Sequence, residues 1–405
     1  MTARIDLPNQ SRPEPRLPEQ PAAQPGGRLA VVIAAHNEEA VIAATLESVI
    51  AAHDARDVFV FCDACTDGTA QIARRMLSAG NVVDHPTNVG KSRGLEYMLH
   101  QFILPGGYEF VSIIDADTTV EPGFFQRALE VARRPGIAGV TGQVKSRWYW
   151  NPFSAYRTFL YAVWQAVFKR IQSVLGSVVI ASGCSTVWRT AALAAVEWDH
   201  RMSTEDFSLT MQVHRRRLGA IRYLPSAVVW TQDPFSLGAY IRQSYRWTRA
   251  FWESIRKYRV GVQWISLRKP RLRVSLLDIS TLFLLAFVLL YAAALLAGPF
   301  LVLWPTPIDF RLFTLDTSGE FFVWLLMQYL LVGALVVLVA VAAGRPLLVL
   351  FTPAIVLLIY VDVLVSLLAL LSTIRSQYPR GRKAQTSAWV SPERQAVRSG
   401  DLRAK

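Results

Sequence analysis

The sequence predicts an α/β domain with a mostly parallel sheet, followed by interfacial helices and a C-terminal α-helical transmembrane region. Two observations support the domain: short β-branched runs alternate with helical patterns, and polar or acidic residues follow the ends of those runs. Long uncharged apolar runs in the final third of the chain support the transmembrane region. Strand–helix alternation is typical of parallel sheets covered by helices, and about 20 apolar residues cross a bilayer as a helix.

Composition excludes several classes of protein. The 405 residues are 52% hydrophobic and 18% charged, whereas soluble proteins are about 25% charged. A disordered or nucleic-acid tail protein is excluded, because such chains are poor in apolar residues. The formal net charge of +13 in so apolar a chain indicates contact with anionic lipid and no nucleic-acid partner. Three cysteines make no disulfide framework and suit a reducing cytoplasm.

Composition also divides the chain into five segments. Residues 1–27 are polar, rich in proline and glutamine and without a secretory apolar core, so we expect a disordered cytoplasmic arm. The length allows two or three domains, at roughly 100–200 residues each. We expect an α/β domain over 28–235, interfacial helices over 236–275, a transmembrane region over 276–375 and a basic tail over 376–405.

Strands and helices alternate through the first part of the α/β domain. In open sheets of this kind, ligands bind beyond the carboxyl ends of the strands. The sequence places three polar segments at those ends: His36–Glu39, Asp63–Asp67 and Asp115–Asp117. We therefore expect a ligand site at this edge. The expected strands are Leu29–Ala34, Val58–Phe61, Asn81–Val83 and Phe110–Ile114, and the expected helices are Glu38–Ala51, Ala70–Leu77 and Ser92–Phe102.

Asp115 and Asp117 follow a very apolar run. Two carboxylates so close together repel each other unless a cation lies between them. Mg²⁺ prefers one or two carboxylates together with phosphate oxygens, so a divalent ion that carries substrate phosphates is one interpretation. A solvated turn capped by aspartate is the other. The position directly after a buried strand favours the ion.

Cys62 and Cys65 form a C-x-x-C pattern. Alone, such a pattern is typical of a redox-active pair or of half a zinc site. The chain has no second C-x-x-C, and its six histidines are scattered. We therefore interpret residues 62–69 as a polar turn in which Asp63 meets a ligand.

Glu205 and Asp206 begin a helical pattern after Thr204. An acid at this position stabilises the N-terminus of a helix through the helix dipole, which is one interpretation. The other is a general base, which requires a carboxylate held near a substrate hydroxyl.

Two stretches have the pattern of helices that lie on a membrane. Tyr240–Arg259 is basic and aromatic and contains Gln243-Ser244-Tyr245-Arg246-Trp247, which predicts an interfacial amphipathic helix. A core helix of a soluble protein is the alternative for both stretches. The second stretch has an apolar stripe at helical spacing, formed by Phe153, Tyr156, Leu160, Val163, Val167 and Ile171.

Three apolar runs are long enough to cross a membrane: Ile279–Ile308, Phe321–Gly344 and Leu347–Ile374. Buried helices of a soluble protein are the alternative. The third run contains Asp362, and a charge at that depth is costly, so we expect it to face the helix bundle or a water-filled path. A local structural hydrogen bond and a transport role both remain open for it.

Flanking charge predicts the orientation of these runs. Four basic residues over 268–273 precede the first run, which puts that end and the α/β domain in the cytoplasm. The loop 309–320 has an acidic excess and suits the outside. Three spans would then leave the basic tail outside, against the same rule. Either one run is re-entrant or the rule fails for the last span.

Eight motifs in order resemble the family 2 glycosyltransferases, specifically their processive, membrane-embedded synthases. The likeness covers about residues 28–260 and is strongest to bacterial poly-N-acetylglucosamine, hyaluronan and chitin-oligosaccharide synthases. It implies a nucleotide-sugar-binding domain of the GT-A type. The motifs are AAHNEE at 34–39, CDACTDGT at 62–69, NVGKSRGL at 88–95, DAD at 115–117, GVTGQVKSR at 139–147, SGCSTVWR at 182–189, STED at 203–206 and QSYRW at 243–247.

The resemblance implies a donor site for a UDP-sugar. Asp63 would contact the uracil. Asp115 and Asp117 would hold the nucleotide diphosphate, Asp117 through Mg²⁺ or Mn²⁺, so that both acids count as metal residues. Glu38 and Lys91 would belong to the same substrate-binding set.

The resemblance also implies the catalytic and acceptor residues. Asp206 would deprotonate the acceptor hydroxyl, with Glu205 beside it, and Arg246 would lie near the diphosphate. Gln243 and Trp247 would form the acceptor end, where Trp247 stacks on the growing sugar. The acceptor path would be lined by Ser182, Gly183 and Cys184.

The function implied is inverting and processive transfer by a hexosyltransferase of the N-acetylglucosaminyl kind, at the cytoplasmic face of a multi-pass inner-membrane protein. Its partners would be a UDP-sugar, a growing glycan and the lipid bilayer. An alternative is transfer of one sugar to a polyprenyl phosphate or other lipid, against which QSYRW argues. A receptor or transporter with a cytoplasmic binding domain is another, but nucleotide binding alone needs no base.

Two features depart from the family pattern. Cys62 replaces the usual first acid of the turn, and Ala64 replaces the usual glycine. Many relatives also carry spans before the catalytic domain. We therefore expect an export channel to need the three C-terminal spans, the interfacial helices, an accessory export subunit or a homo-oligomer.

Overall fold

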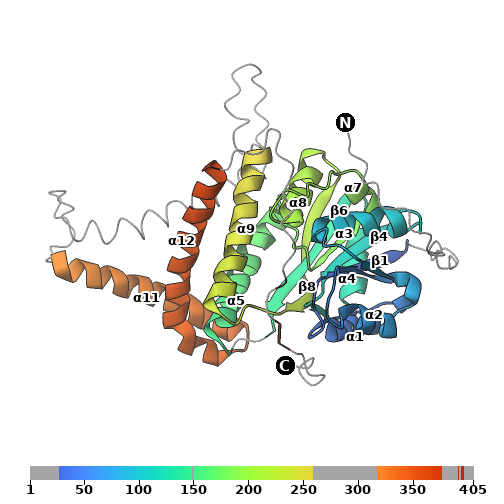
Figure 1. Cartoon of the computed structure of the whole chain (residues 1–405). Coiled ribbons are helices and arrows are strands. Elements are labelled where there is room, and N and C mark those ends of the chain that lie inside the picture. The colour runs from blue at the N-terminus through green and yellow to red at the C-terminus, as the bar shows by residue number, and fades with distance from the viewer. Residues whose placement is uncertain (1–26, 148–149, 259–316, 376–390, 392–393, 396–405) are drawn as a thin grey trace, which may run out of the picture.

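The computed structural model describes residues 27–147, 150–258, 317–375, 391 and 394–395. One mixed sheet lies at the centre of the α/β domain, in the order β3-β2-β1-β4-β7-β6-β8-β5 (Figure 1). β1 pairs in parallel with β2 and β4, β2 with β3, and β6 with β8, which confirms the expected mostly parallel α/β sheet. The strands are β1 (Leu29–Ala35), β2 (Val58–Asp63), β3 (Val82–His85), β4 (Phe110–Asp115), β5 (Thr119–Val120), β6 (Ile137–Ser146), β7 (Thr186–Arg189) and β8 (Ala220–Thr231).

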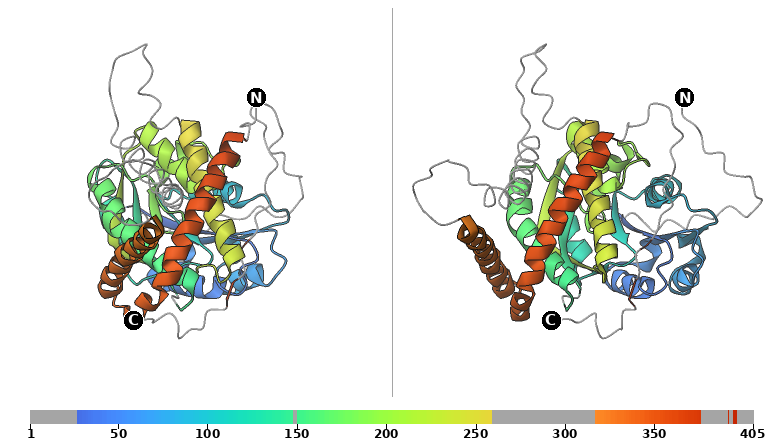
Figure 2. Two further views of the ribbon diagram at one scale, coloured as in Figure 1. Left: turned by 90° about the vertical axis from the view of Figure 1, so that its left-hand side faces the viewer. Right: turned by 60° about the vertical axis from the view of Figure 1, so that its left-hand side comes forward.

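Helices cover both faces of this sheet (Figures 1 and 2). Alternate residues of β1 point to opposite faces, so Val31 belongs to one core cluster and Val32 to the other. The first cluster lies under α1 (Ile42–Ala52), α2 (Thr69–Met76) and α4 (Phe124–Ala132). The second lies under α3 (Lys91–Met98), α7 (Thr190–Ala194) and α8 (Glu205–Arg215). Burial on both faces explains why the central strands are continuous apolar runs.

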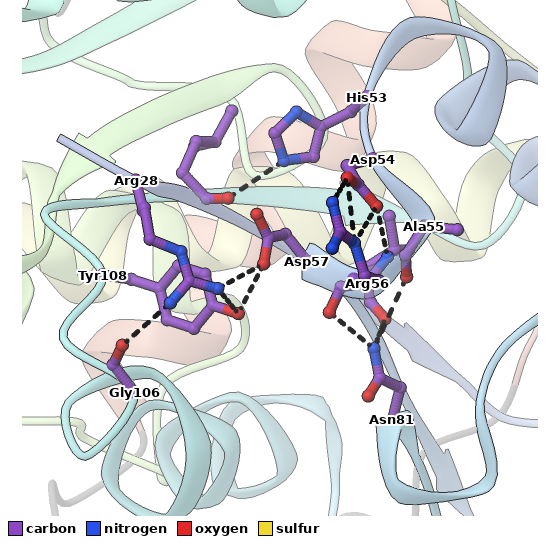
Figure 3. Close-up of polar contacts among 11 residues, drawn as sticks. Arg28, His53, Asp54, Ala55, Arg56, Asp57, Asn81, Gly106 and Tyr108 are labelled. Carbon is purple, nitrogen blue, oxygen red and sulfur yellow. Dashed lines mark hydrogen bonds and ion pairs between the residues drawn. The ribbon is translucent and has the colours of Figure 1, made fainter. Parts of the chain in front are cut away.

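Polar contacts tie the chain together where it enters the central strands, at the edge of the sheet away from the carboxyl ends of those strands (Figure 3). Arg28 pairs with Asp57 at 2.6 Å, and the Tyr108 hydroxyl donates to the same carboxylate oxygen at 2.7 Å. The Asn81 amide donates to the Val58 carbonyl at 2.8 Å, which holds the chain before β3 against β2. These contacts lie away from the opposite edge, where β1, β2 and β4 end.

A layer of long helices lies beside the α/β domain (Figure 2). Asn151 begins α5 (Pro152–Val163), because its side chain accepts from the backbone N–H groups of Phe153 and Ser154. A π-helical turn, Trp164–Lys169, joins α5 to α6 (Arg170–Val174). The other helices are α9 (Leu237–Tyr258), α11 (Thr317–Ala342) and α12 (Thr352–Arg375). A 3₁₀ turn, Pro346–Phe351, leads into α12.

The apolar stripe expected over Phe153–Ile171 divides between two environments. Tyr156 is buried against α9, α11 and α12, whereas Val167 and Ile171 are 49% and 53% exposed. One apolar cluster joins α5 and α9 to α11 and α12, with Tyr240 fully buried in it. The helix α9 that carries the expected interfacial motif therefore packs directly on α12.

Two helices among the described residues have the length and composition of membrane spans, Leu325–Ala342 and Pro346–Arg375. They correspond to the second and third expected runs. Their leucines are widely exposed, such as Leu338 at 65% and Leu368 at 60%, which suits contact with lipid. The first expected run, Ile279–Ile308, lies outside the described residues, as do the arm over 1–26 and most of the tail.

Candidate active site

The carboxyl ends of β1, β2 and β4 meet at one edge of the sheet, since the three strands are parallel neighbours. The turns that follow them carry Glu38, Asp63, Asp115 and Asp117. The Thr45 hydroxyl of α1 donates to the Ala116 carbonyl at 2.7 Å and so anchors the turn between the two last acids. The sheet thus brings together acids that lie up to about 80 residues apart in sequence, as the sequence predicts.

Asp63 is fully buried at the end of β2. Its carboxylate accepts from the backbone N–H groups of Val89 and Gly90, both at 2.8 Å. Gly90 has φ of +89°, a left-handed conformation that suits glycine. In this structure Asp63 therefore holds the turn that leads to Lys91, and the uracil contact stays a prediction.

The two departures from the family pattern have physical consequences. Cys62 points away from Asp63 into the apolar core under β2, because neighbouring side chains of a strand alternate between faces. Ala64 has φ of +52°, where a side chain costs roughly 1–2 kcal/mol and glycine does not. The usual glycine is thus explained by backbone conformation, and alanine is tolerated with strain.

Lys91 connects the donor edge to the helix that carries the expected base. Its ammonium lies 2.6 Å from Asp115 and 2.8 Å from Glu205. Burial works against its charge, but Asp115 and Glu205 outweigh this and raise the pKa of Lys91 above its usual value. Burial alone would raise the pKa of Asp115, whereas Lys91, Arg246 and Arg394 hold it below its usual value. Both partners therefore stay charged near neutral pH.

Asp206 lies in the first turn of α8, beside Glu205. Its Oδ1 accepts from the Thr204 hydroxyl at 2.7 Å and from the Phe207 N–H at 2.9 Å, so it does serve the start of the helix. Burial and the nearby Glu205 charge raise the pKa of Asp206, although Thr204 and Lys91 oppose the shift. A partly buried carboxylate with a raised pKa has the properties of a general base, so the two interpretations of this residue are compatible.

The segment Ser182–Cys184 passes directly over these acids. A methyl group added to Gly183 would lie 3.4 Å from a Glu205 oxygen and 3.6 Å from the Lys91 nitrogen. Burial, together with the charges of Asp115 and Asp117, raises the pKa of the Cys184 thiol. The expected acceptor-path residues therefore share one site with the expected donor and base residues.

Lys169 is a site residue that sequence reasoning missed. Its side chain is buried, and its nitrogen lies 2.9 Å from the Ser182 hydroxyl and 3.3 Å from the Thr141 hydroxyl. Burial lowers the pKa of Lys169 to about 8. The residue lies in the π-helical turn after α5, where the apolar spacing predicts a role only for Val167 and Ile171.

Arg394 is a second residue that sequence reasoning missed. Its guanidinium lies 2.6 Å from an Asp117 oxygen and makes two contacts with Glu38, at 2.8 and 3.0 Å. Glu38 is 2% exposed, and burial raises its pKa although Arg394 opposes the shift. Two further contacts brace this part of the tail: the Ser391 hydroxyl donates to the His36 carbonyl at 2.6 Å, and Gln395 exchanges two hydrogen bonds with Gln232.

The expected acceptor motif lies on α9. Arg157 of α5 donates to Gln243 at 3.3 Å, and its guanidinium carbon lies 4.5 Å from the centre of the Trp247 ring. The Arg246 side chain is exposed, and its charge contributes to the lowered pKa of Asp115. Gln243 and Trp247 are thus held together by Arg157.

The site residues fit a divalent ion in charge and chemistry. Asp115 and Asp117 each hold a cationic group, Lys91 and Arg394. Among the residues that the structure describes, no three His, Cys, Asp or Glu side chains form a ready metal site. Two carboxylates suit Mg²⁺ or Mn²⁺ when phosphate oxygens supply further ligands. An ion would therefore bind here together with a diphosphate.

Comparisons with known proteins identify the family of this chain. Residues 25–250 match the family model described as glycosyltransferase like family 2. The chain is 28% identical to poly-beta-1,6-N-acetyl-D-glucosamine synthase of Staphylococcus aureus (strain COL) over 221 residues, 54% of this chain and 53% of that protein. It is 27% identical to the synthase of the same name from Staphylococcus epidermidis over 247 residues, 58% of this chain and 59% of that protein. The chain thus spans just over half the length of these relatives.

A solved structure supports the fold. Mannosyltransferase PcManGT from Pyrobaculum calidifontis, in complex with GDP-Man and Mn²⁺, matches with a TM-score of 0.56 and 17% identity, over 84% of this chain and 90% of that one. This likeness bears on architecture alone. With the family match over more than half of its length, the chain belongs to the family 2 glycosyltransferases and has their GT-A fold.

Proposed function

We propose that this glycosyltransferase moves a sugar, with inversion, from a UDP-sugar to the end of a growing polysaccharide at the cytoplasmic face of the inner membrane. The observation that carries the proposal is the double contact of Lys91 with Asp115 and Glu205. It joins the donor edge of the sheet to the helix that begins with Asp206. A protein that only binds a nucleotide has no use for a base at that place.

On the donor side, fixed positive charge supports departure of the nucleotide diphosphate. The partly buried ammonium of Lys91 lies between two carboxylates, and the charge of Arg246 helps to lower the pKa of Asp115. Preorganised charges of this kind stabilise developing negative charge at low reorganisation cost. Asp117 and Asp115 would hold Mg²⁺ or Mn²⁺, which when bound supplies further charge neutralisation at the diphosphate.

On the acceptor side, Asp206 takes the proton of the acceptor hydroxyl. The hydroxyl oxygen forms a bond to the anomeric carbon of the donor sugar, and the bond from that carbon to the UDP oxygen breaks. UDP leaves with the bonding electron pair, and one displacement inverts the anomeric carbon. The raised pKa of Asp206 makes it a stronger base than an exposed aspartate.

The relatives suggest the sugar, and the apolar helices suggest the place. Because curated relatives of this chain include poly-beta-1,6-N-acetyl-D-glucosamine synthases, we propose UDP-N-acetylglucosamine as the donor and a poly-N-acetylglucosamine chain as the acceptor. The exposed apolar surfaces of α11 and α12 support a membrane-bound enzyme. Export of the product, with or without a further subunit, is part of the same proposal.

Membranes that contain the full chain, incubated with a panel of radiolabelled nucleotide sugars and Mg²⁺ or Mn²⁺, test the proposal. A polymer made only from UDP-N-acetylglucosamine is expected. Asp206→Asn should abolish incorporation, whereas Asp54→Asn, an exposed change beside Arg56, should not. A product with a single labelled sugar on a lipid would favour the lipid-acceptor alternative over processive synthesis. No incorporation from any donor would overturn the proposal.

A further inference from the structure

Asp362 lies inside α12, an apolar helix long enough to span a membrane, where an unpaired charge is costly. Two tyrosine hydroxyls satisfy it. Tyr156 of α5 donates to one carboxylate oxygen at 2.8 Å, and Tyr240 of α9 donates to the other at 2.5 Å. The acid therefore makes a structural contact that docks α12 onto α5 and α9.

Of the two tyrosines, Tyr240 has its ring against Arg157, and the Tyr156 ring packs on Tyr240 at 6.0 Å between ring centres. The Tyr240 ring stacks on Phe153 at 5.7 Å between ring centres, and the Arg157 guanidinium lies 4.8 Å from the centre of its ring. Tyr240 is fully buried, so its position leaves Arg157 little freedom. The Tyr156 hydroxyl contacts the same carboxylate, but no cation–π contact links its ring to Arg157 among the described residues.

Arg157 lies between the Tyr240 ring and the Trp247 ring, at 4.8 and 4.5 Å from their centres. The same guanidinium donates to Gln243 at 3.3 Å and to the Ser244 hydroxyl at 2.9 Å. At 2% exposure it is desolvated, and cation–π contacts are strongest under such conditions. One planar group thus holds both the amide and the indole of the acceptor motif.

We infer that Arg157 is a positioning residue for the acceptor end, and that Asp362 of α12 sets its place through Tyr240. The inference rests on the proposed function, in which Trp247 stacks on the growing sugar. An acceptor that slides by one sugar in each cycle needs a platform whose orientation survives the movement. A shift of α12 would reach Trp247 through three contacts, Asp362–Tyr240, Tyr240–Arg157 and Arg157–Trp247. Elongation should therefore respond to changes in this helix that leave donor chemistry intact.

The test compares donor hydrolysis with elongation in purified full-length protein. UDP release from UDP-N-acetylglucosamine without acceptor reports donor chemistry. Extension of a defined N-acetylglucosamine oligomer reports the acceptor end, as kcat and KM for the oligomer and as product length. Arg157→Lys keeps the charge but loses the planar fork, and should raise KM for the oligomer about tenfold and shorten the product, with hydrolysis within about twofold of wild type.

The paired variants Tyr240→Phe and Tyr156→Phe separate positioning from simple docking of α12. Each removes one hydroxyl bond to Asp362, so both should lower the melting temperature by a similar amount. Only Tyr240→Phe should shorten the product and raise KM for the oligomer. Equal effects of the two variants on elongation, or equal losses of hydrolysis and elongation in Arg157→Lys, would overturn the inference.

The same assay distinguishes this inference from the proposed function. Wild-type protein that elongates the oligomer while the variants show no selective defect would refute positioning and leave the proposed function standing. Wild-type protein that neither hydrolyses the donor nor elongates the oligomer would refute the proposed function itself.

Discussion

Replacing Arg394 by glutamine should strengthen binding of a divalent ion at Asp117. The guanidinium holds the Asp117 oxygen at 2.6 Å and covers Glu38 with two further contacts. An ion that takes the same oxygen has to displace this group. The variant removes the competing charge and leaves two carboxylates that attract a cation more strongly.

The size of the effect follows from one broken contact. A hydrogen bond to a charged partner contributes about 1.5–3 kcal/mol, and about 1.4 kcal/mol changes a dissociation constant tenfold. The pair is well buried, with side chains 13% and 8% exposed, so solvent screens it little. We expect Kd for Mn²⁺ without nucleotide to fall about tenfold in Arg394→Gln, and by less in Arg394→Lys, which keeps a charge.

Mn²⁺ titration followed by electron paramagnetic resonance of the free ion measures this Kd directly in purified full-length protein. The rise in melting temperature with added Mn²⁺ is a second readout, because an ion that binds only the folded state stabilises it. Arg56→Gln is the matched control, since its ion pair with Asp54 is exposed and lies at the far edge of the sheet. An unchanged or weaker Kd in Arg394→Gln would refute the competition at Asp117.

Four further predictions concern the base Asp206, its pH dependence, the Trp247 ring and the strained turn at Ala64. Asp206→Asn should lower transfer at least about 100-fold while UDP-sugar binding, measured by calorimetry, survives; loss of binding as well would give Asp206 a structural role. Because the base acts when deprotonated and burial raises its pKa, kcat in wild type should fall with decreasing pH at values above the ordinary aspartate pKa of 3.8. Trp247→Ala should reduce elongation more than UDP-sugar hydrolysis, and equal losses would argue against stacking. Ala64→Gly should raise the free energy of unfolding by about 0.5–1 kcal/mol, as relief of φ strain exceeds the added entropy of the unfolded chain; a lower value in denaturant titration would contradict this.

The central strands could be predicted because their residues are apolar on both faces and bounded by polar turns. The expected run Leu29–Ala34 is β1 with one residue added. The third strand was misplaced at its end, since Asp84 and His85 look like turn residues. They continue β3 because they pair with Cys62 and Asp63 of β2, a tertiary contact that no local pattern contains.

The first helix shows the same limit at its other end. The expected helix begins at Glu38, whereas α1 begins at Ile42. The backbone carbonyl of Glu38 accepts from the N–H groups of Val41 and Ile42, and its side chain binds Arg394. The turn is therefore shaped by the site, which overrides the helical periodicity of the segment that follows.

Among the site residues, those on sheet turns follow from the strand pattern and those on α8 and α9 from the family resemblance, whereas neither predicts Arg157, Lys169 or Arg394. Asp115 and Asp117 follow a strand, so the topology of a parallel sheet places them at the ligand edge. Arg394 follows no strand and belongs to no periodic pattern, and it is one of 43 lysines and arginines. Arg157 lies within the apolar stripe of α5. Helical spacing there predicts which apolar residues pack, but it gives no role to a cation between them.

The substitution of Cys62 for the usual first acid is explained by the face on which it lies. Its side chain is fully buried in the apolar cluster under β2, beside Val60 and Ala73. An ionised carboxylate at this position would cost several kcal/mol unless a partner reached it, whereas a thiol behaves as a small apolar group. Asp63 lies on the opposite face, is fully buried as well, and receives two backbone N–H groups that keep its charge satisfied. The site therefore retains Asp63, the acid that holds the turn at Val89 and Gly90. The change at position 62 affects the apolar cluster under β2 and leaves the site residues unchanged.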